Sequence, residues 1–115
     1  MNTNSSNNAL VFERRNRMTI TKSVNGTSLS IALSGRLDTT TAPQLEAELK
    51  NSLEGKTELI LDFAELSYIS SAGLRILLST QKIMNTQGKM IIRNVCDDIL
   101  EVFDLTGFQE YLTIE

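Results

Sequence analysis

The chain has 115 residues, 41% of them hydrophobic and 22% charged, which is the size and composition of one ordinary globular domain. It contains no histidine, and this excludes Ser-His and Cys-His nucleophile pairs, histidine-ligated metals and histidine acid–base catalysis. The single cysteine, Cys96, excludes an intramolecular disulfide, and we expect no metal site and no cofactor.

The charge balance and the distribution of apolar residues indicate which partners and which cellular location to expect. From Met18 onward there are 8 basic and 13 acidic residues, a net charge of −5, which argues against a nucleic-acid partner. No stretch reaches the roughly 20 apolar residues of a membrane-spanning helix, and the first residues lack an apolar signal-peptide core. We therefore expect a cytoplasmic monomer without membrane insertion.

The first part of the chain predicts an arm followed by a hairpin. Residues 1–17 are polar and rich in Asn and Ser, which is typical of a flexible N-terminal arm. Residues 19–24 and 27–34 have strand character, and Asn25-Gly26 between them is a hairpin turn signal.

Helices and strands alternate after the hairpin. Thr41 and Gln44 have the capping-box spacing that predicts the start of a first helix, with the apolar stripe Ala42, Leu45, Leu49 and Leu53. Residues 59–63 are almost continuously apolar, as expected for a central strand buried on both faces. The remaining predicted elements are a helix over 71–86, a strand over 89–94, a third helix from Asp97 or Asp98 to Gly107, and an edge strand over 111–114.

This order of elements predicts an α/β fold. We expect a single domain over residues 18–115, with a mixed, mostly parallel sheet of four to five strands and helices packed on it. The loop that contains Asp38 and the loop after the central strand could then lie at the same end of the sheet, where ligand and partner sites gather.

Two serines mark the junction after the central strand. Ser70 or Ser71 would occupy the N-cap of the second helix, where a hydroxyl accepts a hydrogen bond from a free backbone N–H. From spacing alone, capping and small-residue packing explain both serines more simply than a switch. A helix N-terminus also accommodates a phosphoryl group, and a phosphoserine adds about −1.5 to −2 charges at neutral pH. Phosphorylation could therefore change the surface without unfolding the helix.

Catalysis finds little support in the remaining motifs. Ser71-Ala72-Gly73 lacks the preceding Gly-x pair of a hydrolase nucleophile elbow, and the chain has no histidine base. Solvated charges that suit helix dipoles explain the carboxylates Asp62, Glu65, Asp97 and Asp98 better than catalytic pairs do. We therefore expect that the protein is not an enzyme.

The segments Gly35 to Asp38, Leu59 to Phe63 and Ser70 to Leu74 together resemble the STAS domain family, specifically bacterial anti-sigma factor antagonists. The resemblance covers about Met18 to Glu115. It implies that the dephosphorylated form binds an anti-sigma factor that is also a serine kinase, and thereby releases a sigma factor. It further implies that the kinase phosphorylates Ser71 and that a PP2C-type phosphatase reverses the modification.

The resemblance also implies a partner surface and leaves alternatives open. That surface comprises Asp38, Ser70, Ser71, Ala72, Gly73, Leu74 and Arg75. Many antagonists carry Asp where this chain has Ser70, so Ser70 could compete with Ser71 as the phosphoacceptor. Arg75 replaces a residue that is often small, and it could pair with phosphoserine or with an acidic partner.

Two other functions compete with the phosphorylation switch. One is a constitutive scaffold or adaptor subunit of a transport or signalling assembly, in which the serines only cap and pack. The other is a small nucleotide-binding or hydrolytic enzyme, although the chain has neither a Walker loop nor a glycine fingerprint.

Overall fold

A computed structural model describes residues 18–115, and the predicted N-terminal arm lies outside the described residues. The sheet has four strands in the order β1-β2-β3-β4, with bounds Met18–Asn25, Ser28–Leu37, Glu58–Ile69 and Lys89–Arg93. β1 pairs antiparallel with β2, whereas β2–β3 and β3–β4 are parallel. The predicted mixed, mostly parallel sheet is therefore confirmed, and β3 is an interior strand.

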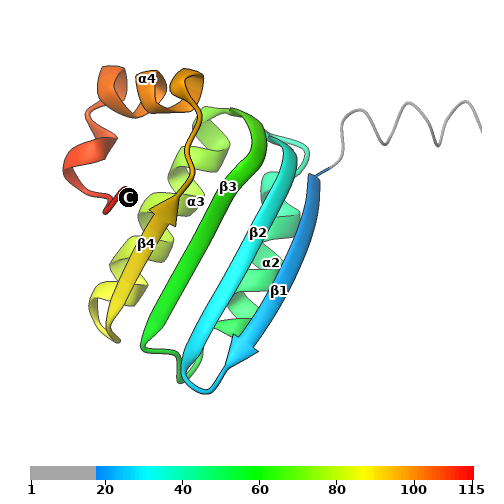
Figure 1. Ribbon diagram of the computed structural model, residues 1–115, viewed down its shortest axis with the longest axis vertical. Coiled ribbons are helices and arrows are strands. Elements are labelled where there is room, and N and C mark those ends of the chain that lie inside the picture. Colours follow the sequence, from blue (N-terminus) through cyan, green and yellow to red (C-terminus); the bar gives the residue numbers. More distant parts are fainter. Residues whose placement is uncertain (1–17) are drawn as a thin grey trace, which may run out of the picture.

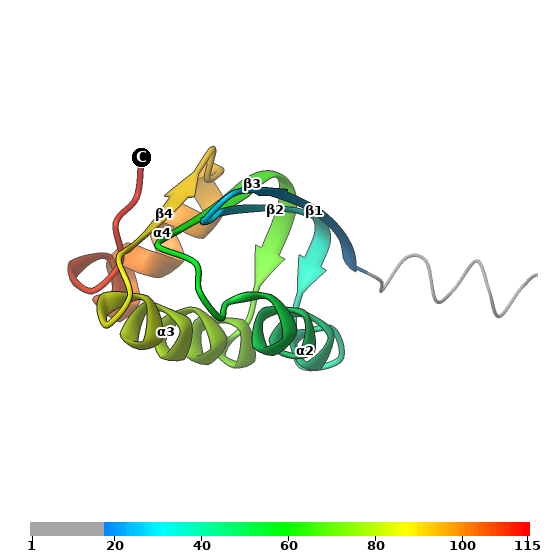
Figure 2. The same cartoon turned by 90° about the horizontal axis from the view of Figure 1, so that it is seen from below.

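Three helices accompany the sheet: α2 (Ala42–Ser52), α3 (Ser71–Asn85) and α4 (Asp97–Thr106). Figure 2 shows α2 and α3 side by side on one face of the sheet, which is why buried side chains alternate with more exposed ones along β2 and the first half of β3. The expected burial of residues 59–63 on both faces is therefore wrong, because Ile60 and Asp62 are only half-buried. The core between the layers contains Leu29, Ile31 and Leu33 of β2 with Leu45 and Leu49 of α2, all of them buried. The helical stripe predicted from the sequence faces this core.

The predicted opening hairpin is confirmed, but its turn lies one residue later than the predicted Asn25-Gly26. Asn25 pairs with Ser28, so the loop consists of two residues, Gly26 and Thr27. Gly26 has a φ of 63°, the left-handed conformation that glycine adopts at no steric cost. The hairpin thus fixes the register of β1 along β2.

β3 is longer than the predicted 59–63, and the expected connection over residues 64–70 is mostly strand. The β2–β3 pairing shifts register twice, between Ala32 and Ser34 and between Gly35 and Arg36. Each shift places an extra residue in β3, which breaks the two-residue alternation of buried and exposed side chains. The sequence pattern therefore ends near Phe63, although the strand continues to Ile69.

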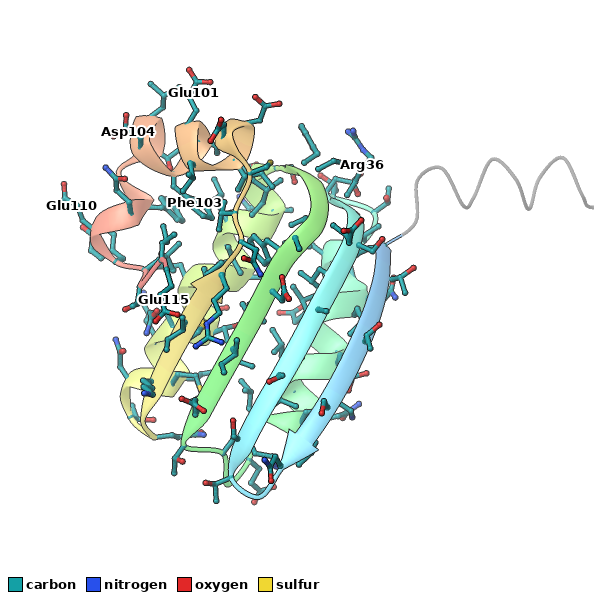
Figure 3. The ribbon with its side chains drawn as sticks, in the orientation of Figure 1. Arg36, Glu101, Phe103, Asp104, Glu110 and Glu115 are labelled. Atoms are coloured by element: carbon teal, nitrogen blue, oxygen red, sulfur yellow. The ribbon has the colours of Figure 1, made fainter. Side chains whose placement is uncertain are left out.

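Helix α4 lies beyond the end of β4, and the chain then returns to the side of β4 (Figure 1). Gly107, with a φ of 77°, ends α4 as predicted, but the residue at the N-cap is Cys96 rather than Asp97 or Asp98. The predicted edge strand over 111–114 is wrong, because only Ile114 forms a bridge, to Ile92, after a 3₁₀ helix at Phe108–Glu110. Figure 3 shows Phe103 on the inner side of α4, where it is fully buried.

Candidate functional site

Two loops meet at the C-terminal ends of β2 and β3. Leu37 and Ile69, the last residues of these parallel strands, are register partners, and the backbone N–H of Ser70 donates to the Leu37 carbonyl at 2.9 Å. One loop, Asp38–Thr41, leads into α2, and the other, Ser70, leads into α3. The expectation that both loops lie at one end of the sheet is therefore confirmed, and we call this region the switch end.

The loop Asp38–Thr41 is held by its own polar side chains. The Asp38 carboxylate accepts hydrogen bonds from the Thr40 backbone at 3.0 Å and from the Thr40 hydroxyl at 2.8 Å. The buried Thr41 hydroxyl donates to the Arg36 carbonyl at 2.7 Å and accepts from the Asp38 backbone at 2.9 Å. The predicted capping box is wrong: Thr41 occupies the N-cap without a side-chain cap bond, and Gln44 donates to the Met18 carbonyl instead.

These contacts set the charge of Asp38. Partial burial raises the pKa of the Asp38 carboxyl, but hydrogen bonds from Thr40 and Thr41 outweigh burial and hold this pKa below its ordinary value. Asp38 is therefore ionised at neutral pH, and its carboxylate is hydrogen-bonded within its own loop.

Sequence analysis missed the contact between Arg36 and Tyr68 beside Asp38. The Arg36 guanidinium stacks over the Tyr68 ring at 4.1 Å from the ring centroid, and Arg36 Nε lies 3.6 Å from Asp38 Oδ2. Arg36 and Tyr68 are register partners on β2 and β3, and Figure 3 shows Arg36 projecting outward at the end of β2. The sequence offered a cation, Arg36, inside the motif Gly35 to Asp38 and an aromatic residue, Tyr68, two positions before Ser70, but their contact depends on strand register.

The two serines at the start of α3 have different environments. Ser70 is the N-cap residue, but it makes no side-chain cap bond, and its hydroxyl oxygen is buried without a hydrogen-bond partner. Ser71 is the first residue of α3 and is exposed. The predicted capping role is therefore wrong for both hydroxyls, whereas the backbone carbonyl of Ser70 does accept the first helical hydrogen bond, from Leu74 at 3.0 Å.

Close packing rather than side-chain capping holds the start of α3. Gly73 is buried, and a β-carbon at this position would lie 2.7 Å from Leu37 Cγ and 2.8 Å from Ile69 Cγ1. Glycine therefore lets the first turn of α3 approach the ends of β2 and β3. Leu74 is also buried, so Gly73 and Leu74 contribute packing. Ser71 and Arg75 are the exposed polar residues of this segment.

A groove of about 530 Å³ begins beside the first turn of α3 and runs between α2 and α3. Ala72, Arg75 and Lys82 line it from α3, and Pro43 and Glu46 line it from α2. Ala72 is half-buried and Arg75 is exposed. Of the residues predicted to form the partner surface, Ala72 and Arg75 thus line this groove, and Ser71 precedes Ala72 at the start of α3.

Residues 18–115 contain no group of three or more Cys, Asp or Glu side chains that could hold a metal ion. Asp62 accepts hydrogen bonds from the Asn94 side chain at 3.0 Å and the Ala64 backbone at 2.9 Å, which gives it a structural role. Within the same range, no helix is long and apolar enough to cross a membrane.

Comparisons with known proteins agree with this architecture. A family model described as the STAS domain matches residues 18–115. The chain is 38% identical over 82 residues to "Putative anti-sigma factor antagonist BtrV" of Bordetella bronchiseptica, which covers 70% of this chain and 71% of that protein. An anti-sigma factor antagonist from Mycobacterium paratuberculosis has a TM-score of 0.77 at 20% identity, over 84% of each chain. The Bacillus cell fate determinant SpoIIAA in its phosphorylated form has a TM-score of 0.67 at 22% identity, over 84% of this chain and 91% of that chain.

Proposed function

Because the chain belongs to the STAS domain family, we propose that it is an anti-sigma factor antagonist controlled by phosphorylation of Ser71. Its dephosphorylated form binds an anti-sigma factor that is also a serine kinase, and a sigma factor is thereby released. Phosphorylation weakens this binding, and a PP2C-type phosphatase restores it. The exchange takes place in the cytoplasm, and residues 18–115 form the STAS domain that carries it out.

The observation that carries this proposal is the contrast between the two serines. A kinase must bring the serine hydroxyl against the γ-phosphoryl group of ATP, so the hydroxyl must be reachable from solvent. Ser71 is exposed at the first position of α3, whereas the Ser70 hydroxyl is buried. This contrast supports Ser71 as the acceptor and disfavours Ser70.

The relatives support the same function. The Bordetella relative carries the name of an anti-sigma factor antagonist, and the SpoIIAA structure is of a phosphorylated form. A fold that holds a phosphoryl group in a relative supports the view that this fold tolerates the modification. The N-terminus of α3 adds a physical reason, since its free N–H groups and dipole favour negative charge.

Phosphate transfer in this scheme needs no catalytic group from the chain itself. The Ser71 oxygen forms a bond to the γ-phosphorus of ATP, ADP leaves, and the hydroxyl proton passes to the kinase. Hydrolysis by the phosphatase returns serine and inorganic phosphate. The absence of histidine from the sequence supports the proposal that the protein is a substrate and a binding partner rather than an enzyme.

Tandem mass spectrometry of the protein from its native cells tests the proposal. We expect the mass of one phosphoryl group on Ser71, removed by phosphatase treatment. The modification should vanish in Ser71→Ala and persist in the matched control Ser70→Ala. Phosphorylation of Ser71→Ala at the wild-type level would overturn the assignment.

Partner binding tests the second half of the proposal. Immobilised wild-type protein and Ser71→Ala should both retain the anti-sigma factor, and Ser71→Asp should retain less of it. Equal retention by all three proteins, with no phosphate found under any growth condition, would instead favour the constitutive scaffold.

A further inference from the structure

Ser71 and Arg75 lie one helical turn apart on α3, and both are exposed. Residues four apart on a helix are neighbours on one face, with β-carbons about 5–6 Å from each other. Long helical side chains also lean toward the N-terminus, which directs the Arg75 guanidinium toward the position of Ser71. The helix geometry therefore places a cation within reach of any group attached to the Ser71 oxygen.

Arg75 is also the cation at the switch end that forms no ion pair within residues 18–115. Glu46 of α2 lines the same groove as Arg75. The other arginine at this end, Arg36, is occupied by Asp38 at 3.6 Å and by the Tyr68 ring at 4.1 Å. Lys82 lies on the same helix, but about three turns beyond Ser71, which is too far for contact.

We propose that Arg75 is the internal counter-ion of phosphorylated Ser71, so that the modified protein holds its own phosphoryl group against the first turn of α3. The inference rests on the proposed phosphorylation of Ser71. A guanidinium binds phosphate oxygens through two parallel hydrogen bonds, and the free N–H groups at the start of α3 add to the same attraction.

This pairing has two consequences for the switch. The phosphorylated form gains a contact that the unmodified form lacks, so the first turn of α3 becomes more stable when the switch is off. The guanidinium that pairs with the phosphoryl group also competes with a phosphatase for it. Arg75 therefore prolongs the phosphorylated state.

The test uses full-length protein with phosphoserine installed at position 71 during translation, so that no kinase is needed. Phosphorus NMR follows the second ionisation of the phosphoserine, which has an ordinary pKa near 6. The other charged groups near it are Glu46 on α2 and the Arg36–Asp38 pair at the end of β2. The variants are Arg75→Gln and, as the matched control on the same helix, Lys82→Gln.

We expect the phosphoserine pKa to be higher by about 0.3 or more in Arg75→Gln than in wild type, because the dianion loses its counter-ion. Lys82→Gln should leave the phosphoserine pKa near the wild-type value, and Arg75→Lys should bring it part of the way back from the Arg75→Gln value. Added salt should reduce the pKa difference between wild type and Arg75→Gln. Phosphorylation should also raise the melting temperature more in wild type than in Arg75→Gln.

Equal titration curves for Arg75→Gln and Lys82→Gln would overturn the inference, whatever happens in native cells. Absence of phosphate on Ser71 in cells would instead overturn the proposed function alone.

Discussion

The loop Asp38–Thr41 and the junction at Ser70 follow neighbouring parallel strands, yet they are stabilised in opposite ways. In the first, the side chains of Asp38, Thr40 and Thr41 bind one another and the nearby backbone. In the second, backbone hydrogen bonds and the close packing of Gly73 hold the chain, and the Ser70 hydroxyl has no partner. Polar side chains thus hold the first loop in place, whereas the second is held by backbone hydrogen bonds and packing.

This difference has a functional meaning. A side chain that holds a loop cannot be modified without loss of that loop, whereas an exposed hydroxyl such as that of Ser71 can accept a phosphoryl group at little structural cost. The proposed phosphorylation of Ser71 would therefore change the charge at the start of α3, while the loop beside it keeps its shape. We expect substitutions in the two places to separate stability from switching.

Among the substitutions in the two compared regions, the Asp38–Thr41 loop and the start of α3, Thr41→Val should have the largest effect. Valine keeps the shape of threonine, but it removes the hydroxyl that donates to the Arg36 carbonyl at 2.7 Å and accepts from the Asp38 backbone at 2.9 Å. Two backbone groups would then lose a partner in a buried place, which costs about 2 kcal/mol. Urea unfolding measures this loss; a cost below about 0.5 kcal/mol would show that water replaces the hydroxyl.

Gly73→Ala should cost less, about 1 kcal/mol. The new methyl group would crowd Leu37 Cγ at 2.7 Å, although alanine also has a higher helix propensity, which offsets part of the strain. The same unfolding experiment gives the net effect.

A double-mutant cycle identifies the cause of the Gly73→Ala effect. Leu37→Ala alone should cost about 2–5 kcal/mol, because Leu37 is fully buried. In that background the crowding at Leu37 disappears and only the contact with Ile69 Cγ1 at 2.8 Å remains, so Gly73→Ala should cost less than it does in the wild-type background. Simple additivity of the two substitutions would contradict the packing role of Gly73.

Asp38 should make stability depend on pH. The folded protein holds the pKa of Asp38 below its ordinary value, so its carboxylate stabilises the fold above about pH 4. That contribution is lost as the pH falls through the lowered pKa. The stability difference between wild type and Asp38→Asn should therefore shrink with acidification, from well under 1 kcal/mol toward zero. Because Glu48, Glu58 and Asp62 also have a lowered pKa, only this difference isolates Asp38.

Much of the fold could be predicted from the sequence because its signals are local. The Asn25-Gly26 turn and the stripe with Leu45 and Leu49 each depend on residues within a few positions of one another. The length of β3 could not be predicted, because its two extra residues appear only when β2 is aligned beside it. Local patterns therefore identify elements, and pairing decides where they end.

The candidate site divides in the same way. Motif positions pointed to Asp38, Ser71 and Arg75, but the stacking of Arg36 on Tyr68 depends on the irregular β2–β3 register. The unequal exposure of Ser70 and Ser71 likewise arises from how the first turn of α3 sits on Leu37 and Ile69.

Ser70→Ala should have the smallest effect, and it is the sharpest check on the contrast between the two loops. An N-cap serine is ordinarily worth about 1 kcal/mol, because its hydroxyl binds a free N–H of the first turn. Ser70 makes no such bond, and its hydroxyl is buried without a partner, so alanine should change the unfolding free energy by less than about 0.5 kcal/mol. A loss of a full N-cap contribution would mean that the Ser70 hydroxyl caps α3 in solution. The junction would then depend on a polar side chain just as the Asp38–Thr41 loop does, and the contrast between the two loops would be lost.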